Sequence, residues 1–121
     1  MHVSYVVLYV QDENACATFW TEQVGMIEKN RIALGDNSVI KVGFADQEFS
    51  FELVPLAIMQ ENPHGLDLAT PSIAFTVEDL HATHAKLVAN GVEAVEPSDA
   101  MGRMSFAFSD NEGRWFAVLQ G

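Results

Sequence analysis

The chain contains the same strand-and-helix pattern twice. Residues 5–12 read Tyr-Val-Val-Leu-Tyr-Val-Gln-Asp, and residues 72–79 read Ser-Ile-Ala-Phe-Thr-Val-Glu-Asp. Each segment is apolar, ends in Val-x-Asp and continues into a helical pattern. An internal repeat of this size in a chain of 121 residues predicts two copies of one structural unit within a single domain.

Composition limits the partners that the chain is expected to bind. Hydrophobic residues make up 49% of the sequence, with only eight Gly and four Pro, which is typical of a globular protein. Seventeen acidic and six basic residues give a net charge of -11, which repels nucleic-acid phosphates and anionic membrane surfaces. We therefore expect neither nucleic acid nor a membrane as a partner. The same charge favours a cationic ligand, although acidic surfaces most often serve solubility.

The cysteine content and the apolar runs indicate the compartment. Cys16 is the only cysteine, so the chain has no internal disulfide and an oxidising compartment is not implied. The first residues do not read as a signal sequence, and no apolar run approaches the length of a membrane span. We expect a cytoplasmic protein.

The first half predicts one helix and four strands. Asp12 is a candidate N-cap and Gly25 a candidate C-cap, which predicts a helix over 14–24 between them. Alternation and turn residues predict strands over 2–10, 26–34, 38–44 and 49–54. The connector at 55–71 is long for a structureless loop, so we expect a short helical piece or a flap over a site.

The second half repeats this order. A strand over 72–77 leads into a helix that begins after Asp79 and ends at Asn90-Gly91, with Leu80, Ala85, Leu87 and Val88 as its apolar positions. We then expect a strand over 92–95, a loop over 96–102, a strand over 103–109, a turn over 110–113 and a last strand over 114–120.

Two β-α-β-β-β units in tandem resemble the vicinal oxygen chelate superfamily, which includes glyoxalase I, extradiol dioxygenases, fosfomycin-resistance enzymes and bleomycin-resistance proteins. The turn Asp110-Asn111-Glu112-Gly113-Arg114 looks like the family's Asp-Pro-Asp-Gly-Asn turn. Phe19-Trp20, followed by Val24-Gly25-Met26, looks like its Phe-Tyr and Leu-Gly-Phe motifs. The resemblance covers essentially the whole chain.

The resemblance implies an α+β fold in one domain, 1–121. It would consist of unit 1 (2–54), the connector (55–71) and unit 2 (72–120), whose mixed sheets curl around a cleft. Helices would cover the convex faces, and strand alternation then sorts the side chains. On the helix-covered face we expect Val6, Leu8, Val10, Phe51, Leu53, Ile73, Phe75, Val77, Phe106, Phe108, Phe116 and Val118. Small, hydroxylated, aromatic and charged side chains fall on the other face, which suits a ligand cavity.

Metal-using members of the superfamily place one ligand on the first and last strand of each unit. The matching positions here are Tyr5, Glu52, Ser72 and Ala117, and only Glu52 is a useful ligand for a divalent ion. We therefore expect no metal and no cofactor. The missing ligands disfavour glyoxalase or dioxygenase activity that depends on a metal.

The remaining reactive side chains do not suggest a site. His81 and His84 are three residues apart on the second helix, on the convex side, where we expect them to be solvated. His2 has the wrong parity relative to Tyr5, and His64 lies in the connector. Cys16 has no basic neighbour in sequence, so a packed thiol is expected there rather than a nucleophile.

The first functional hypothesis is a metal-free protein, similar to the bleomycin-resistance branch, that holds an antibiotic or a metabolite. The resemblance places the candidate ligand-binding residues in the cleft: Tyr5, Tyr9, Lys41, Glu52, Ser72, Arg103 and Trp115. The aromatic side chains would stack on the ligand, although core packing is an equal alternative for Trp115. Glu52 would orient a cationic or hydrogen-bond-donating group, unless it pairs with Lys41 or Arg103, in which case a neutral ligand is preferred.

Two other hypotheses stay open. The chain is alternatively a lyase, an isomerase or a dioxygenase-like enzyme of the same superfamily with Glu52 as general base. It is otherwise a dimerisation or accessory module. The resemblance also implies a homodimer, in which some relatives exchange units between the two chains.

Overall fold

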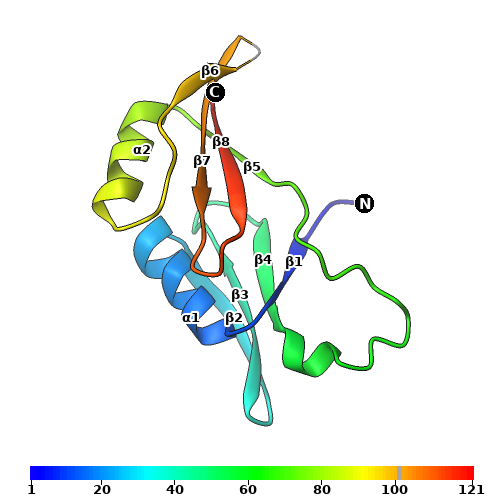
Figure 1. Ribbon diagram of the computed structural model, residues 1–121. Coiled ribbons are helices and arrows are strands. Elements are labelled where there is room, and N and C mark those ends of the chain that lie inside the picture. The colour runs from blue at the N-terminus through cyan, green and yellow to red at the C-terminus, as the bar shows by residue number, and fades with distance from the viewer. Residues whose placement is uncertain (101) are drawn as a thin grey trace. The chain divides into compact units, whose positions relative to one another are not determined.

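The computed structural model describes residues 1–100 and 102–121, which form two compact units, Met1–Thr70 and Pro71–Gly121. Each unit contains a four-stranded mixed sheet and an α-helix that follows its first strand (Figure 1). The architecture is α+β, as expected from the sequence. The connector lies with the first unit up to Thr70.

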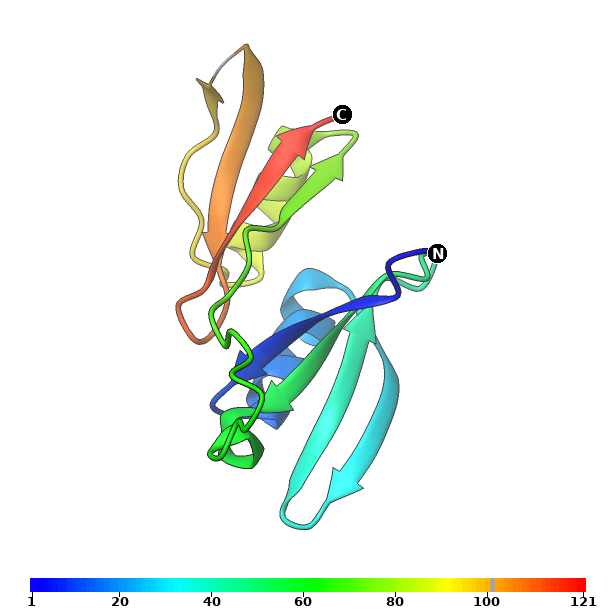
Figure 2. The same cartoon turned by 90° about the vertical axis from the view of Figure 1, so that its right-hand side faces the viewer.

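The first unit begins with β1 (Tyr5–Val10), followed by α1 (Glu13–Thr18) and a π-helix, η1 (Phe19–Val24). The strands β2 (Ile27–Leu34), β3 (Asn37–Gly43) and β4 (Ser50–Pro55) complete the sheet in the order β1-β4-β3-β2. Strand β1 is parallel to β4, and the other pairs are antiparallel. The helix lies on one face of this sheet (Figure 2).

The helix predicted over 14–24 is present, but its second half is π-helical. Asp12 is the N-cap and accepts the Ala15 backbone N–H at 3.0 Å. Gly25 ends the helix with a φ of 100°, a left-handed conformation that glycine adopts without strain. Phe19 and Trp20 are adjacent at the start of this π-helical segment, and both are buried.

The connector contains a short 3-10 helix, η2 (Leu56–Met59), directly after β4. The expectation of a short helical piece in this segment is therefore confirmed. Farther along, the Asn62 side chain both donates to the Leu66 carbonyl and accepts its N–H, which closes the tip around His64. His64 itself is exposed.

The second unit contains β5 (Ala74–Val77), α2 (Leu80–Ala89), β6 (Ser98–Ala100), β7 (Arg103–Ser109) and β8 (Trp115–Gln120). Its sheet order is β5-β8-β7-β6, with β5 parallel to β8. Asp79 accepts the Ala82 N–H at 3.0 Å, as Asp12 accepts that of Ala15. The two units thus repeat both the topology and the helix cap.

The strand predicted over 92–95 is wrong, and a strand occupies part of the predicted loop at 96–102. Residues Glu93 and Val95 do bond to β7 through backbone groups, at 2.9 Å each, but only an isolated bridge forms there. Pro97 follows and has no N–H to donate, so the ladder is interrupted and resumes as β6.

The apolar faces pack as the alternation predicted in the centre of each sheet. The buried members of the predicted set are Leu8, Val10, Phe51, Leu53, Phe106, Phe108, Phe116 and Val118. The expected residues Val6, Ile73, Phe75 and Val77 are only half-buried. Full burial of each side chain stabilises the fold by roughly 1.5–3 kcal/mol.

The apolar face of α2 differs from the prediction. Leu80 and Leu87 are buried, but Ala85 is exposed and Val88 is 49% exposed. His84 takes the core-facing position between the two leucines, with its ring edge-on to Phe106 at 5.0 Å. The prediction that His84 is solvated is therefore wrong, whereas His81 is exposed as expected. The His84 Nε2 atom is buried and has no hydrogen-bond partner within the described part of the chain.

The turn before β8 is held by a buried carboxylate. Asp110 Oδ1 accepts the backbone N–H groups of Glu112 and Arg114, both at 2.9 Å, and Asp110 pairs with the Arg114 guanidinium at 3.1 Å. Burial lowers the pKa of Arg114, but the hydrogen bonds and charges of Glu112 and Asp110 outweigh it, so that pKa lies above its ordinary value. The predicted turn at 110–113 is present.

The two N-caps give a matched stability test. We expect Asp12→Ala and Asp79→Ala each to lower the free energy of unfolding by roughly 0.5–2 kcal/mol, because each leaves a helix N–H without its side-chain acceptor. Asp12→Asn and Asp79→Asn keep the acceptor oxygen and should retain most of the stability. Urea denaturation measures the difference, and equal stability of the Ala and Asn variants would contradict the assigned caps.

Candidate ligand-binding site

The face of the first sheet opposite α1 brings together three of the side chains selected from the sequence. Lys41 on β3 and Glu52 on β4 are direct cross-strand partners. Glu52 is also the register partner of Val7 on β1, two residues beyond Tyr5. Because side chains alternate along a strand, Tyr5, Lys41 and Glu52 point to the same side of the sheet.

The three side chains are in contact. The Lys41 Nζ atom lies 3.9 Å from Glu52 Oε2 and 4.3 Å from the centre of the Tyr5 ring. The side chains of Lys41 and Glu52 are 30% and 21% exposed, so solvent still screens this pair. Of the two alternatives for Glu52, internal pairing with Lys41 is the one present.

Strand β2 extends this face with apolar side chains. Ile32 pairs with Val39, which has the same parity as Lys41, so Ile32 lies on the same face. Ile32 is 52% exposed, and Leu34 two residues further on is 44% exposed. The sequence analysis did not select either residue, although the predicted strand over 26–34 contains both.

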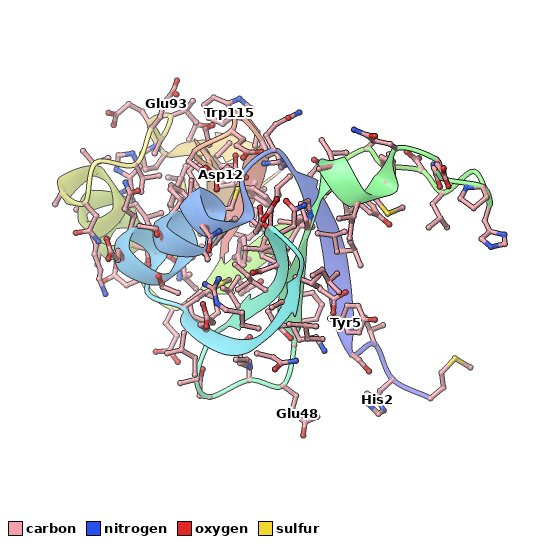
Figure 3. The ribbon with its side chains drawn as sticks, turned by 90° about the horizontal axis from the view of Figure 1, so that it is seen from below. His2, Tyr5, Asp12, Glu48, Glu93 and Trp115 are labelled. Carbon is pink, nitrogen blue, oxygen red and sulfur yellow. The ribbon has the colours of Figure 1, made fainter. Side chains whose placement is uncertain are left out.

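A cavity of 310 Å³ lies at the end of this sheet where β1 begins. The side chains around it are polar or charged for the most part: His2, Ser4, Lys29, Lys41, Glu48 and Ser50. His2, Tyr5 and Glu48 lie at this end of the first unit (Figure 3). Lys29 and Glu48 were missed by the sequence analysis because strand alternation did not indicate that either would line a cavity.

The other selected residues lie apart from this cluster. Tyr9 is half-buried on the same strand face as Tyr5, four residues or about 13 Å along β1. In the second unit, Arg103 begins β7, whereas Trp115 on β8 pairs with Ser109 at the other end of β7. Trp115 and Arg103 are therefore about 20 Å apart. Ser72 is exposed just before β5.

The second unit also leaves an aromatic side chain accessible. Trp115 is 47% exposed at the start of β8, where Figure 3 labels it, so it is not a core residue. Arg103 donates from Nε to the Gln120 carbonyl at 3.3 Å. It does not take part in the Lys41–Glu52 pair.

The side chains at the four metal-ligand positions of the superfamily do not fit a divalent ion. Ala117 has no donor atom, Ser72 is a weak ligand when neutral, and Glu52 is already engaged with Lys41. Among residues 1–100 and 102–121, no three His, Cys, Asp or Glu side chains gather closely enough to hold a metal.

Comparison with known proteins places the chain in a family. The sequence profile of the Glyoxalase/Bleomycin resistance protein/Dioxygenase superfamily matches residues 2–118. The chain belongs to this superfamily. The resemblance to the vicinal oxygen chelate group and the α+β fold expected from it are thereby confirmed.

Individual relatives span the whole chain. The Bacillus subtilis (strain 168) protein YetH is 30% identical over 120 residues, covering 98% of this chain and 97% of YetH. Among solved structures, UcmS2 has a TM-score of 0.81 at 23% identity, covering 98% of this chain and 97% of its own. TnmS3, an antibiotic binding protein from Streptomyces sp. CB03234, has a TM-score of 0.80 at 20% identity, covering 99% and 95%. These structural matches show the fold.

The helices of the described residues are too short or too polar to cross a membrane.

Metal addition tests the ligand set directly. We expect Zn²⁺, Ni²⁺, Mn²⁺ and Fe²⁺ to leave the Tm of the purified protein unchanged, because an ion that bound only the folded state would raise it. Differential scanning fluorimetry with elemental analysis measures this. The opposite result would be a stoichiometric ion that is lost in Glu52→Gln and retained in Glu28→Gln, whose carboxylate pairs with Arg31 elsewhere on the sheet.

Proposed function

We propose that this protein binds a small aromatic molecule, an antibiotic or a metabolite, without a metal and without chemical conversion. The observation that carries the proposal is the cluster of Tyr5, Lys41 and Glu52 on the face of the first sheet opposite α1. This face combines an accessible ring, a compensated charge pair and exposed apolar side chains. Ligand sites commonly pair apolar surface with a few fixed polar groups.

Accessible aromatic side chains favour a flat ligand. Tyr5 is 41% exposed and Trp115 is 47% exposed, each on the helix-free face of its own sheet. Large rings that remain in contact with water offer stacking surfaces, each worth about 0.5–1.5 kcal/mol beyond area burial. The Lys41 ammonium lies 4.3 Å from the centre of the Tyr5 ring, in a cation–π contact with one face of that ring.

The charge pair argues against a cation as the main determinant of binding. Glu52 already has an ammonium group 3.9 Å away, so a cationic ligand would have to compete with Lys41 for the carboxylate. The net charge of -11 still attracts cations from a distance, but it is spread over the whole chain. At close range the paired cluster favours an aromatic ligand that carries no positive charge.

The relatives support a binding role. TnmS3, which shares the fold over 99% of this chain, is an antibiotic binding protein. The ligand positions that metal-dependent members of the superfamily use are occupied here by Tyr5, Ser72 and Ala117 as well as Glu52. As the setting of this function we propose a homodimer in the cytoplasm.

A thermal-shift screen against aromatic antibiotics and common aromatic metabolites tests the proposal. A ligand present at about 100 times its Kd stabilises the folded state by roughly 2.7 kcal/mol, which raises the Tm by several degrees. We expect Tyr5→Leu to weaken binding of a hit by roughly two- to tenfold, because it removes one stacking ring. The affinity of Trp115→Ala for the same hit shows whether the second unit contributes to binding.

The matched control is Val95→Ala, which shortens another exposed apolar side chain, 48% exposed, on the second unit. It should bind as the wild type does. If no compound in the screen binds, the proposal fails. If a compound is consumed, and Glu52→Gln stops turnover while Glu28→Gln does not, the protein is an enzyme of this superfamily instead.

A further inference from the structure

We infer that the cavity at the start of β1 binds a carboxylate, so that the ligand is an aromatic acid. This inference rests on the proposed function and names its ligand class. The carboxylate would lie against Lys29, and the ring that carries it would lie toward Tyr5.

The backbone positions Lys29 for this role. The register of β2 and β3 shifts between Glu28 and Asn30, so Lys29 occupies a β-bulge and has no partner in the ladder. A bulge re-aims the side chain that it contains, and Lys29 becomes part of the cavity lining. Its Nζ atom donates to the Gln47 carbonyl in the loop between β3 and β4.

A glycine makes room for the lysine stem. A Cβ atom at Gly43 would lie 3.1 Å from Lys29 Cε, 3.2 Å from Nζ and 2.7 Å from the Phe49 carbonyl oxygen. Any larger residue at position 43 would therefore displace the lysine or the following loop. The bulge, the glycine and the loop carbonyl together hold one ammonium group at the cavity.

The charges around the cavity favour an anion. The sequence has three lysines, and two of them, Lys29 and Lys41, line this one cavity in a chain of net charge -11. Lys41 is compensated by Glu52. Lys29 has no carboxylate partner within the described residues, so its charge is available to a ligand.

The remaining lining points to a carboxylate rather than a phosphate. Ser4 and Ser50 add hydroxyl groups that donate to an anion, whereas Glu48 adds a negative charge that a dianion would meet. Among the described residues, no arginine lines the cavity, and arginine is the residue whose fork matches a phosphate. One ammonium without a carboxylate of the described chain within ion-pair distance, two hydroxyl donors and the nearby Glu48 carboxylate fit a group of charge minus one better than a dianion.

The cavity and the aromatic cluster share Lys41. Lys41 lines the cavity and also lies 4.3 Å from the centre of the Tyr5 ring. Ser4 immediately precedes Tyr5 in the chain. In our proposal, a carboxylate at Lys29 directs the ring of the ligand across Lys41 toward Tyr5, where the proposed function requires an aromatic group.

Three compounds with the same ring test the charge preference: 2-naphthoate, 2-naphthamide and 2-naphthylmethylamine. Their dissociation constants are measured by isothermal titration calorimetry, and ¹⁵N-¹H spectra locate the site. We expect naphthoate to bind about tenfold more tightly than the amide or the amine, since an ammonium–carboxylate hydrogen bond is stronger than a neutral one. The amide shifts of Ser4, Tyr5 and Ser50 should respond.

Variants of Lys29 separate its charge from its packing. Lys29→Met and Lys29→Gln should remove the preference for naphthoate and leave the affinity for naphthamide unchanged. Lys29→Arg should retain the preference. Lys86→Met is the matched control, because it removes the same charge from α2 and should bind as the wild type does.

The outcomes distinguish this inference from the proposed function. If the three compounds bind equally well, or if both neutral variants keep the preference for naphthoate, the carboxylate site is overturned and the aromatic site stands. If none of the three binds and the antibiotic and metabolite screen is also empty, both fail. Binding of naphthoate that moves only amides away from the start of β1 would also overturn the carboxylate site.

Discussion

Side chains alternate along a β-strand, and each unit of this protein covers only one face of its sheet with a helix. The covered faces are apolar: Phe51 and Leu53 are buried in the first unit, and Phe106 and Phe116 in the second. Most of the stability of each unit depends on this burial, since each such side chain contributes roughly 1.5–3 kcal/mol. The opposite faces carry a more mixed set of side chains, in which Tyr5 and Trp115 remain partly exposed.

On the first sheet, the face opposite α1 carries a small polar cluster with Lys41 at its centre. One ammonium group lies 3.9 Å from the Glu52 carboxylate, 4.3 Å from the centre of the Tyr5 ring, and in the lining of the cavity at the start of β1. The contacts are partly exposed and individually weak. What matters is where these groups lie: the Tyr5 ring, the Lys41–Glu52 pair and the Lys29 ammonium are all at one end of one sheet.

The sequence was a good guide wherever local chemistry decides the structure. The caps at Asp12 and Asp79 and the left-handed Gly25 could be predicted because they depend on neighbouring residues. The strand over 103–109 could be predicted from the alternation of its side chains. Errors arose where a backbone detail overrode the pattern. Pro97 interrupts the ladder after residues 93–95, and His84 rather than Ala85 faces the core because α2 meets the sheet along Leu80 and Leu87.

The sequence alone determined the doubled unit and, within each regular strand, which side chains share a face, because repetition and a two-residue period are properties of the chain itself. Only the tertiary structure decided which of those side chains touch. It paired Glu52 with Lys41, separated Arg103 from Trp115, and brought Lys29 to the cavity through a bulge. Strand register and bulges depend on contacts between distant segments, which no local pattern in the sequence records.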